Sequence, residues 1–334
     1  MIRNLAVLLL VAAAAWSADS DFNGRWDITV KNSPRGRAWW LQVEGAGSAG
    51  IKGKFIGFPG GDLNDIQHIW IEKGELRFTY DGHDERQEYR ARLIAGKLEG
   101  TFASGDTHLD WTAARAPAID ERDDGSWREA RPVEVFNGRD ISNWHGLTKD
   151  ASLGWSVNDG ILKGNGAATD LISNDKFWNF KLHVEYRTPA HSNSGIGLRG
   201  RYEVQILQDD GRPIDRHSNA ALYSRILPAE NVTRPAGEWQ TYDIRLVGRH
   251  VTITLNGKTV TQGVIDGLTA IACDADEGVP GPLMLQGDHG PVEFRSIVLT
   301  PLVKTAQKGA PRAALGQRTL LLSGGAGCPP FAPR

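Results

Sequence analysis

Sulfur-containing residues are scarce in this sequence, which has two cysteines and two methionines among 334 residues. The two cysteines, Cys273 and Cys328, are too few for a disulfide framework and lack the spacing of metal ligands, so we expect structural or incidental thiols. No segment beyond the N-terminus approaches the length of a membrane span. The formal net charge is only -2. It gives no electrostatic reason to expect nucleic acid or an anionic membrane as a partner.

The first 18 residues are typical of a secretory signal peptide. Arg3 precedes an apolar run from Leu5 to Ala15, and small residues follow around Ser17 and Ala18. The run is too short to span a bilayer comfortably. We therefore expect a periplasmic or secreted protein with no membrane attachment after cleavage. Export would also permit a disulfide between the two cysteines.

Short alternating runs fill the rest of the chain, punctuated by many of its 39 glycines. Their period of two residues predicts an all-β protein without amphipathic helices. Residues 19–115 are expected to form a small antiparallel barrel or sandwich, and residues 116–132 a charged linker between prolines. Residues 133–302 read as a two-sheet sandwich. Residues 303–334 are basic and rich in glycine and proline, as in a mobile tail.

The stretch of residues 197–213 reads as a strand that carries polar groups on one face. Alternation places Tyr202, Val204 and Ile206 on one side and Glu203 and Gln205 on the other. A sandwich needs only one face of each sheet for its core. The other face can be concave, and a concave face with carboxylate, amide and guanidinium groups suits a polyol ligand.

A purely structural interpretation competes with this one. Glu185 and Arg187 on the preceding strand, together with Arg199 and Glu203, could form cross-strand ion pairs on a solvated face. Alternation alone leaves both interpretations open.

Five stretches between about residues 133 and 302 carry a recognisable pattern. In chain order they read EVFNGRDISNWHG, VEYRTPAHSNSGIGLRGRYEVQILQ, ALYSRILPAENVTRPAGEWQTYDI, ITLNGKTV and GPLMLQGDHGPVEFRSIVLTPL. Together they resemble the 3-keto-disaccharide hydrolase family, which has a concanavalin-like jelly-roll fold. Ala220 departs from the glycine that family members often have.

The resemblance implies an enzyme that cleaves glycosides whose sugar carries a ketone at C3. That ketone acidifies the C2 proton, so removal of the proton can expel the group at C1 by β-elimination, and water addition would complete a net hydrolysis. Such a site needs a base, a group that stabilises the enolate oxygen, and an acid for the leaving group. Ordinary glycosidase chemistry with two carboxyl groups also stays open.

Three residues are expected to perform this chemistry. His289, in the stretch LQGDHG, is the best base, because a neutral imidazole titrates near working pH. Glu203 is the alternative base, and Arg199 the expected enolate stabiliser. Each also has a structural alternative, such as a histidine held by a turn carbonyl. The residues expected to bind substrate are Gln205, Gln286, Asp288, Tyr223, Glu185 and Arg187.

A divalent cation is the one cofactor that the sequence leaves open. Asp209, Asp210, Asp215 and His217 lie close together, but without EF-hand or zinc spacing, which favours a solvated loop. The sequence also lacks a dinucleotide fingerprint. We therefore expect a separate sugar 3-oxidoreductase to supply the ketone to this protein, whose direct partner is a small carbohydrate.

Two other functions are compatible with the sequence. One is a non-catalytic, lectin-like carbohydrate-binding module, because this fold serves both uses. In the other, the N-terminal barrel binds the ligand. Trp39 and Trp40 point to opposite faces of one strand, so we expect at least one of them to be exposed or to line a cavity, with Trp70 on another strand. Trp144, Trp155, Trp178 and Trp239 are expected in the core of the second domain.

Overall fold

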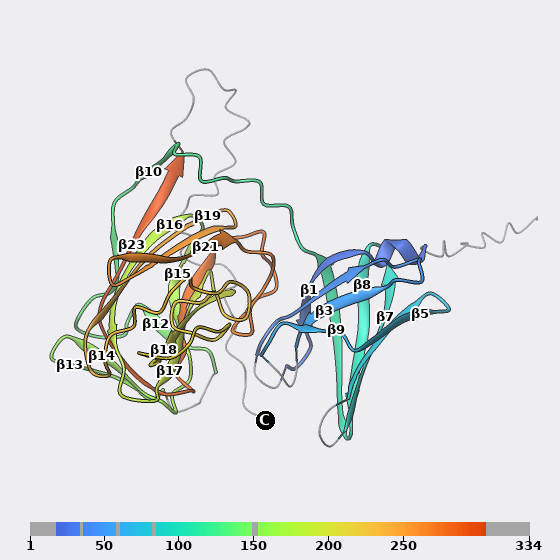
Figure 1. Cartoon of the computed structure of the whole chain (residues 1–334), viewed down its shortest axis with the longest axis horizontal. Coiled ribbons are helices and arrows are strands. Elements are labelled where there is room, and N and C mark those ends of the chain that lie inside the picture. The colour runs from blue at the N-terminus through green and yellow to red at the C-terminus, as the bar shows by residue number, and fades with distance from the viewer. Residues whose placement is uncertain (1–17, 34–35, 58–60, 82–84, 149–152, 305–334) are drawn as a thin grey trace, which may run out of the picture.

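The chain forms two β-domains joined by an extended segment, as the computed structural model of the protein shows (Figure 1). The structure describes residues 18–33, 36–57, 61–81, 85–148 and 153–304. The expected signal peptide before residue 18, the tail beyond residue 304 and Cys328 lie outside the described residues. Within these ranges, no helix has the length and apolar character needed to cross a membrane.

The first domain is an antiparallel meander of nine strands that follows a short 3-10 helix, η1 (Asp19–Phe22). Strand β1 pairs with both β2 and β9, so the order across the sheet is β4-β3-β2-β1-β9-β8-β7-β6-β5. The strands are β1 (Gly24–Val30), β2 (Trp39–Glu44), β3 (Lys52–Ile56), β4 (Asn64–Asp65), β5 (His68–Glu72), β6 (Glu75–Asp81), β7 (Arg86–Ile94), β8 (Lys97–Ser104) and β9 (Thr107–Arg115).

Aromatic side chains fill the interior of this first domain. Phe78 and Tyr89 stack with ring centroids 4.4 Å apart, and Trp39 and Phe102 pack edge-on at 5.8 Å. All four side chains are buried. Such large aromatic residues supply much of the stabilising apolar burial. These rings therefore form a packed core, and the hypothesis that this domain binds the ligand stays a prediction.

The second domain is a sandwich of a nine-stranded and a five-stranded antiparallel sheet. The larger sheet contains β10 (Trp127–Glu129), β11 (Val133–Phe136), β13 (Trp155–Asn158), β14 (Ile161–Asn165), β16 (Phe180–Arg187), β19 (Gln240–Val247), β20 (His250–Leu255), β21 (Lys258–Val264) and β23 (Pro291–Lys304). The smaller sheet has the order β12-β15-β22-β17-β18 and contains β12 (Trp144–Gly146), β15 (Leu171–Phe177), β17 (Asn193–Leu198), β18 (Tyr202–Leu207) and β22 (Gly281–Leu285).

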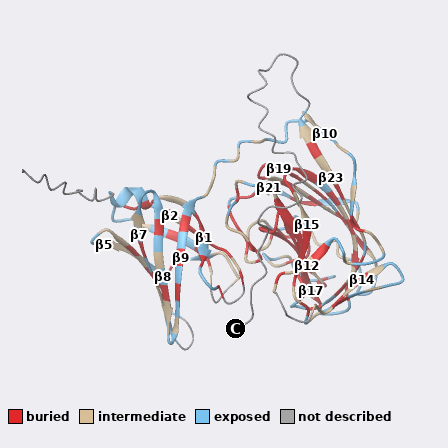
Figure 2. Cartoon of the chain, turned by 180° about the vertical axis from the view of Figure 1, so that it is seen from behind, coloured by how far each residue is buried: buried red, intermediate tan, exposed pale blue. Residues whose placement is uncertain are grey.

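The core of the second domain lies between its two sheets (Figure 2). Tyr202, Val204 and Ile206 of β18 point into it and are fully buried, as the alternation predicts. Full burial of an aliphatic side chain such as Val204 or Ile206 stabilises the fold by about 1.5–3 kcal/mol. The outward face of β18 is thereby left to its polar residues. The all-β prediction, with a jelly-roll sandwich after a smaller β-domain, is confirmed.

The second sheet begins inside the segment predicted to be a linker. Strand β10 pairs with the end of β23, with Trp127 opposite Lys304. The residues before β10 also lie against the second domain, since Trp178 Nε1 donates to Glu121 Oε1 at 3.1 Å. The freely linking part of residues 116–132 is therefore shorter than expected.

The two domains share a buried core. Trp39 points into the first domain, whereas Trp40 is fully buried in the cluster that fills the second domain. The guanidinium of Arg225 covers the Trp40 ring at 4.2 Å. Neither tryptophan is exposed, because the outward face of β2 is where the second domain docks, but Trp39 lines a cavity, as expected for at least one of this pair. Trp70 is half-buried.

Cys273 takes part in a disulfide, so the expectation of a thiol is wrong for this residue.

Candidate active site

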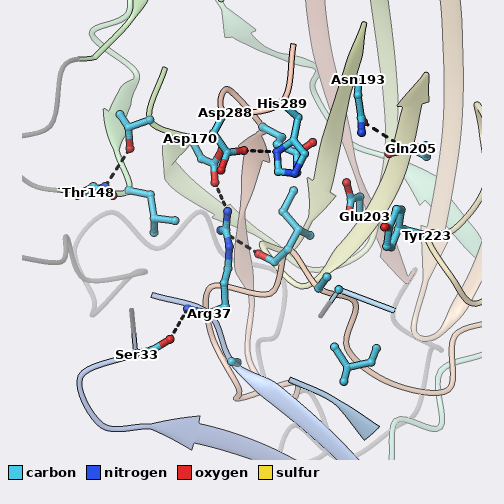
Figure 3. A pocket seen from close by; sticks show the side chains of 18 of the residues that line it. Ser33, Arg37, Thr148, Asp170, Asn193, Glu203, Gln205, Tyr223, Asp288 and His289 are labelled. Atoms are coloured by element: carbon cyan, nitrogen blue, oxygen red, sulfur yellow. Dashed lines mark hydrogen bonds and ion pairs between the residues drawn. The ribbon is translucent and has the colours of Figure 1, made fainter. Parts of the chain in front are cut away.

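A cavity of about 570 Å³ lies where the first domain meets the outward face of the five-stranded sheet (Figure 3). This volume is within the range of small-molecule sites. Both domains line the cavity. Its polar and charged lining residues are Ser33, Arg37, Thr148, Thr169, Asp170, Asn193, Glu203, Gln205, Tyr223, Gln286, Asp288 and His289.

Glu203 points from the start of β18 into this cavity, next to Tyr223. Its side chain is almost wholly buried, and no hydrogen bond or ion pair with another described residue reaches its carboxyl group. Gly195 of the neighbouring strand β17, which pairs with Gln205, has no side chain and so leaves the room that the Glu203 carboxyl group occupies. Burial raises the pKa of Glu203 to about 8, although Arg37 and His289 counteract part of this effect. The carboxyl group is therefore mainly protonated at neutral pH.

His289 and Asp288 form a hydrogen-bonded pair on the loop after β22. Asp288 Oδ1 binds His289 Nδ1, which leaves Nε2 as the second ring nitrogen. The hydrogen bond from Asp288 raises the pKa of His289 above its usual range despite partial burial. Burial alone would raise the pKa of Asp288, but its hydrogen bond and charge interaction with His289 lower it. The pair is thus an imidazole supported by an ionised carboxylate.

Arg37 enters the cavity from the first domain and forms an ion pair with Asp170 of the second (Figure 3). Asp170 is buried just before β15 and also accepts a hydrogen bond from the Gly287 backbone N–H at 2.9 Å. Neither Arg37 nor Asp170 was among the expected site residues. Asp170 could have been noticed as a carboxylate at the start of a buried strand, but Arg37 has no such signal.

Two glutamine amides leave buried acceptors without a partner. The Oε1 atoms of Gln205 and Gln286 have no hydrogen-bond partner among the described residues, although both residues line the cavity. Gln205 is held by its Nε2, which donates to Asn193 Oδ1 at 3.3 Å. Because buried polar atoms are normally satisfied, these two oxygens indicate a ligand with hydroxyl donors.

Tyr223 forms another wall of the cavity. Its ring stacks on His217 with centroids 4.9 Å apart, and His217 Nε2 lies 2.6 Å from Asp62 Oδ1 of the first domain. Burial raises the pKa of Tyr223 to about 12, with a contribution from Asp62. The hydroxyl therefore stays protonated and serves as a hydrogen-bonding group rather than as a base.

Three expected site residues do not reach the cavity. Arg199 lies in the turn after β17, fully buried, where its Nε donates to the Trp178 carbonyl at 2.6 Å. Its guanidinium also covers the Trp178 ring at 3.8 Å. The assignment of Arg199 as enolate stabiliser is therefore corrected, because its contacts with Trp178 inside the second domain hold it away from the cavity.

Glu185 and Arg187 belong to the outer face of the nine-stranded sheet. Glu185 is paired with Arg295, and Arg187 Nε lies 2.5 Å from Glu293 Oε2. Their assignment to substrate binding is corrected too, since β16 lies in the sheet that faces away from the cavity. For these two residues, the structural interpretation as cross-strand ion pairs holds.

The carboxylates of the acidic loop after β18 accept hydrogen bonds from residues in and near that loop. Asp209 accepts hydrogen bonds from the Asn219 backbone N–H at 3.0 Å and the Thr233 hydroxyl at 2.7 Å. Asp215 binds the His217 backbone N–H at 2.7 Å. In the part of the chain that the structure describes, no group of three or more His, Cys, Asp or Glu side chains could hold a metal ion.

The tryptophans of the second domain divide into two kinds. Trp144, Trp155 and Trp178 are buried, as expected. Trp239 is only half-buried, on the outer face, where Arg187 and Arg295 cover it at 4.7 and 4.5 Å. None of the four lines the cavity.

Comparisons with known proteins bear on the second domain. A 3-keto-disaccharide hydrolase of Bacteroides thetaiotaomicron is 27% identical over 143 residues, which is 32% of this chain and 49% of the relative. The chain thus matches about half of that relative's length. Two crystal structures of putative glycosyl hydrolases from Parabacteroides distasonis are also similar. The first is 28% identical in sequence, and its alignment covers 50% of this chain and 82% of the Parabacteroides chain, with a TM-score of 0.45. The second is 20% identical, and its alignment covers 52% of this chain and 94% of the Parabacteroides chain, also with a TM-score of 0.45.

The model of one protein family matches residues 131–300, just over half of the chain. This range contains the five-stranded sheet and every cavity residue of the second domain. It excludes the first domain and Arg37. The chain belongs to the family described as the 3-keto-alpha-glucoside-1,2-lyase-like domain.

Proposed function

We propose that this protein cleaves the glycosidic bond of small 3-keto glycosides by elimination across C1 and C2. One observation carries the proposal: a protonated, unpaired Glu203 and a carboxylate-supported His289 face the same buried cavity. An acid and a base with perturbed pKa values in one cleft are the usual mark of proton-transfer chemistry. The family match and the hydrolase name of the Bacteroides relative support a substrate of this class.

The first half of the reaction removes the aglycone. His289 Nε2 takes the C2 proton, and the electrons of the C2–H bond form an enolate with the C3 carbonyl. As the enolate collapses, a C1–C2 double bond forms and the C1–O bond breaks. Glu203 donates its proton to the departing oxygen, so the aglycone leaves as a neutral alcohol or phenol. The sugar is then an enone with its C3 ketone restored.

The second half adds water to this enone. Ionised Glu203 takes a proton from water while the oxygen of that water bonds to C1. Protonated His289 returns a proton to C2. Both residues end in their starting states, and the overall result is hydrolysis. If the enone leaves before water adds, the same residues perform a lyase reaction.

The cavity is less suited to ordinary glycosidase chemistry. That route needs a second carboxylate that is free to attack C1 or to activate water. Among the carboxylates that line the cavity, Asp170 is bound by Arg37 and Asp288 by His289. Glu203 is the remaining one, and its raised pKa makes it an acid at neutral pH.

The open amide oxygens of Gln205 and Gln286 also favour a second candidate function, a carbohydrate-binding module without catalysis. Hydroxyl recognition explains these two acceptors. It does not explain why the Glu203 carboxyl group is buried without a partner. Such burial is destabilising, and a protein that only binds carbohydrate does not require it.

The proposal extends to where the protein works and what it works with. We propose an exported protein, on the basis of the N-terminal sequence. Because the substrate must already carry the C3 ketone, a separate sugar-oxidising enzyme has to act before this one.

The test is the release of a chromogenic aglycone from one glucoside in its plain and 3-keto forms, after subtraction of spontaneous elimination. Glu203→Gln and His289→Ala are the variants. Glu185→Gln and His183→Ala are matched controls, since both residues lie on the outer face of the nine-stranded sheet. We expect release from the 3-keto form alone, lost in the two variants and kept in the controls. Release from the plain form, or binding without release, would overturn the proposal.

A further inference from the structure

Arg37 reaches the cavity from a domain that lies outside the family match. It sits between β1 and β2 of the first domain, and the neighbouring Ala38 N–H donates to the Ala272 carbonyl of the second domain at 2.7 Å. Its own backbone N–H is held by Ser33 Oγ at 3.2 Å. Arg37 and Ala38 are thus held by backbone hydrogen bonds to both domains, and the Arg37 side chain projects among Asp170, Asp288 and His289 (Figure 3).

The partners of the Arg37 guanidinium leave part of it open to the cavity. One Nη2 hydrogen is directed to Asp170, and Nη1 donates to the Ile271 carbonyl at 3.2 Å and to Met284 Sδ at 3.7 Å. A guanidinium has five N–H donors, so these contacts use three of them. The side chain keeps 14% of its exposure. A ligand in the cavity can accept hydrogen bonds from the remaining N–H groups of Arg37.

The reaction proposed above needs a group that stabilises the developing enolate oxygen, and a fixed cation suits this role. When the C2 proton leaves, negative charge develops on the C3 oxygen, and a preorganised donor there lowers the barrier. Of the described residues that line the cavity, Arg37 and His289 are the two that can carry positive charge. His289 is the base and is neutral when the proton leaves, so Arg37 is left for this role.

We propose that Arg37 is a catalytic residue that binds the C3 oxygen of the substrate and stabilises the enolate, so that the first domain completes the active site of the second. This inference rests on the proposed function. Asp170 acts as a positioning residue, because its ion pair fixes the guanidinium from behind. Docking of the two domains supplies the rigidity that such a donor needs.

Arg25 offers a matched control. It too crosses from the first domain to the second, where its Nη1 donates to the Asp266 carbonyl at 3.0 Å, but it does not line the cavity. Arg25→Ala therefore removes an interdomain contact without touching the site. A double variant combines Arg37→Ala with Asp170→Asn. It avoids leaving the buried Asp170 carboxylate without its partner Arg37.

The experiment measures kcat and KM on the 3-keto glucoside for Arg37→Ala, Arg37→Lys, the double variant and Arg25→Ala, with thermal melting of each. We expect Arg37→Ala and the double variant to lose about 10²–10³-fold in kcat. Arg37→Lys should retain part of the activity, and added guanidinium chloride at low concentration should restore part of it to Arg37→Ala. Arg25→Ala should keep wild-type kcat.

A second readout separates catalysis from a structural role. Arg37, His289, Asp170 and Asp288 are the charged groups that act on Glu203. Because Arg37 lowers the pKa of Glu203, its removal should move the alkaline limb of the pH–rate profile upward. Wild-type kcat in Arg37→Ala, or equal losses in Arg37→Ala and Arg25→Ala, would overturn this inference alone. An inactive wild-type protein would overturn the proposed function with it.

Discussion

The buried position of Glu203 lowers the stability of the folded protein. A carboxyl group with a pKa near 4.5 in the unfolded chain and about 8 in the folded protein binds a proton more tightly when folded. Stability therefore falls as pH rises from 4.5 to 8, by roughly 3–5 kcal/mol in total. Such a cost, with no partner among the described residues to offset it, suits a residue kept for chemistry.

We predict that Glu203→Gln is more stable than the wild-type protein at alkaline pH. At pH 9 the free energy of unfolding should rise by a few kcal/mol, because the variant has no charge to bury. At pH 4 the two proteins should differ little, since Glu203 is then protonated in both states. Urea unfolding at the two pH values measures this, and a variant that is less stable at pH 9 contradicts the assignment.

The same titration shapes the pH dependence of the reaction. Glu203 must be protonated and His289 neutral, so kcat/KM should fall above a midpoint near pH 8. It should also fall on the acid side, below a midpoint above 6.5, since Asp288 raises the pKa of His289. We predict that Glu203→Gln removes the alkaline limb from the residual activity. A wild-type rate that keeps rising through pH 8, after correction for spontaneous elimination, would make Glu203 the base instead.

At the scale of elements, the pairing of β17 with β18 sets the position of the Glu203 carboxyl group. A Cβ atom on Gly195 would lie 2.4 Å from Glu203 Oε1 and 3.0 Å from its Cγ. The steric conflict is therefore with the Glu203 side chain and not with the backbone.

We predict that Gly195→Ala lowers kcat at least tenfold, because Glu203 must turn away from the substrate. Its melting temperature should change by only a few degrees, since the displaced group is the far end of a side chain. Steady-state kinetics and thermal melting together test this. Wild-type kcat would show that the carboxyl position is not critical, and a collapse of stability would show that the backbone moves as well.

The alternation of residues in single strands predicted much of this site, and the arrangement of strands in sheets explains what it missed. Glu203 and Gln205 face the cavity because β18 alternates without interruption. Arg199 breaks this rule since it lies in a turn, with a positive φ of 53°. Alternation also cannot say to which sheet a strand belongs. Glu185 and Arg187 alternate correctly but lie in the sheet that faces away from the cavity.

At the scale of the whole molecule, the docking of the two domains creates the cavity, and no local pattern predicts it. Arg37 and Asp170 are 133 residues apart in sequence and meet only across the interface. Trp40 likewise reads as a surface or cavity residue on an alternating strand, but it is the centre of that interface. The first domain is thus a structural part of the site, although its own core is packed.

Trp40 should couple the unfolding of the two domains. It is fully buried in the core of the second domain while belonging to the first, and Gly267 leaves it room, since a Cβ there would lie 2.2 Å from Trp40 Nε1. Removing it with Trp40→Ala should cost about 3–5 kcal/mol. We predict one cooperative transition for the wild-type protein in calorimetry and two separate transitions for this variant. Its kcat should fall as well, because Arg37 is no longer fixed over the cavity. Trp239→Ala, on the outer face, is the control that should keep both a single transition and full activity. Two transitions in the wild-type protein would mean that the domains dock too weakly for Arg37 to act as a fixed part of the site.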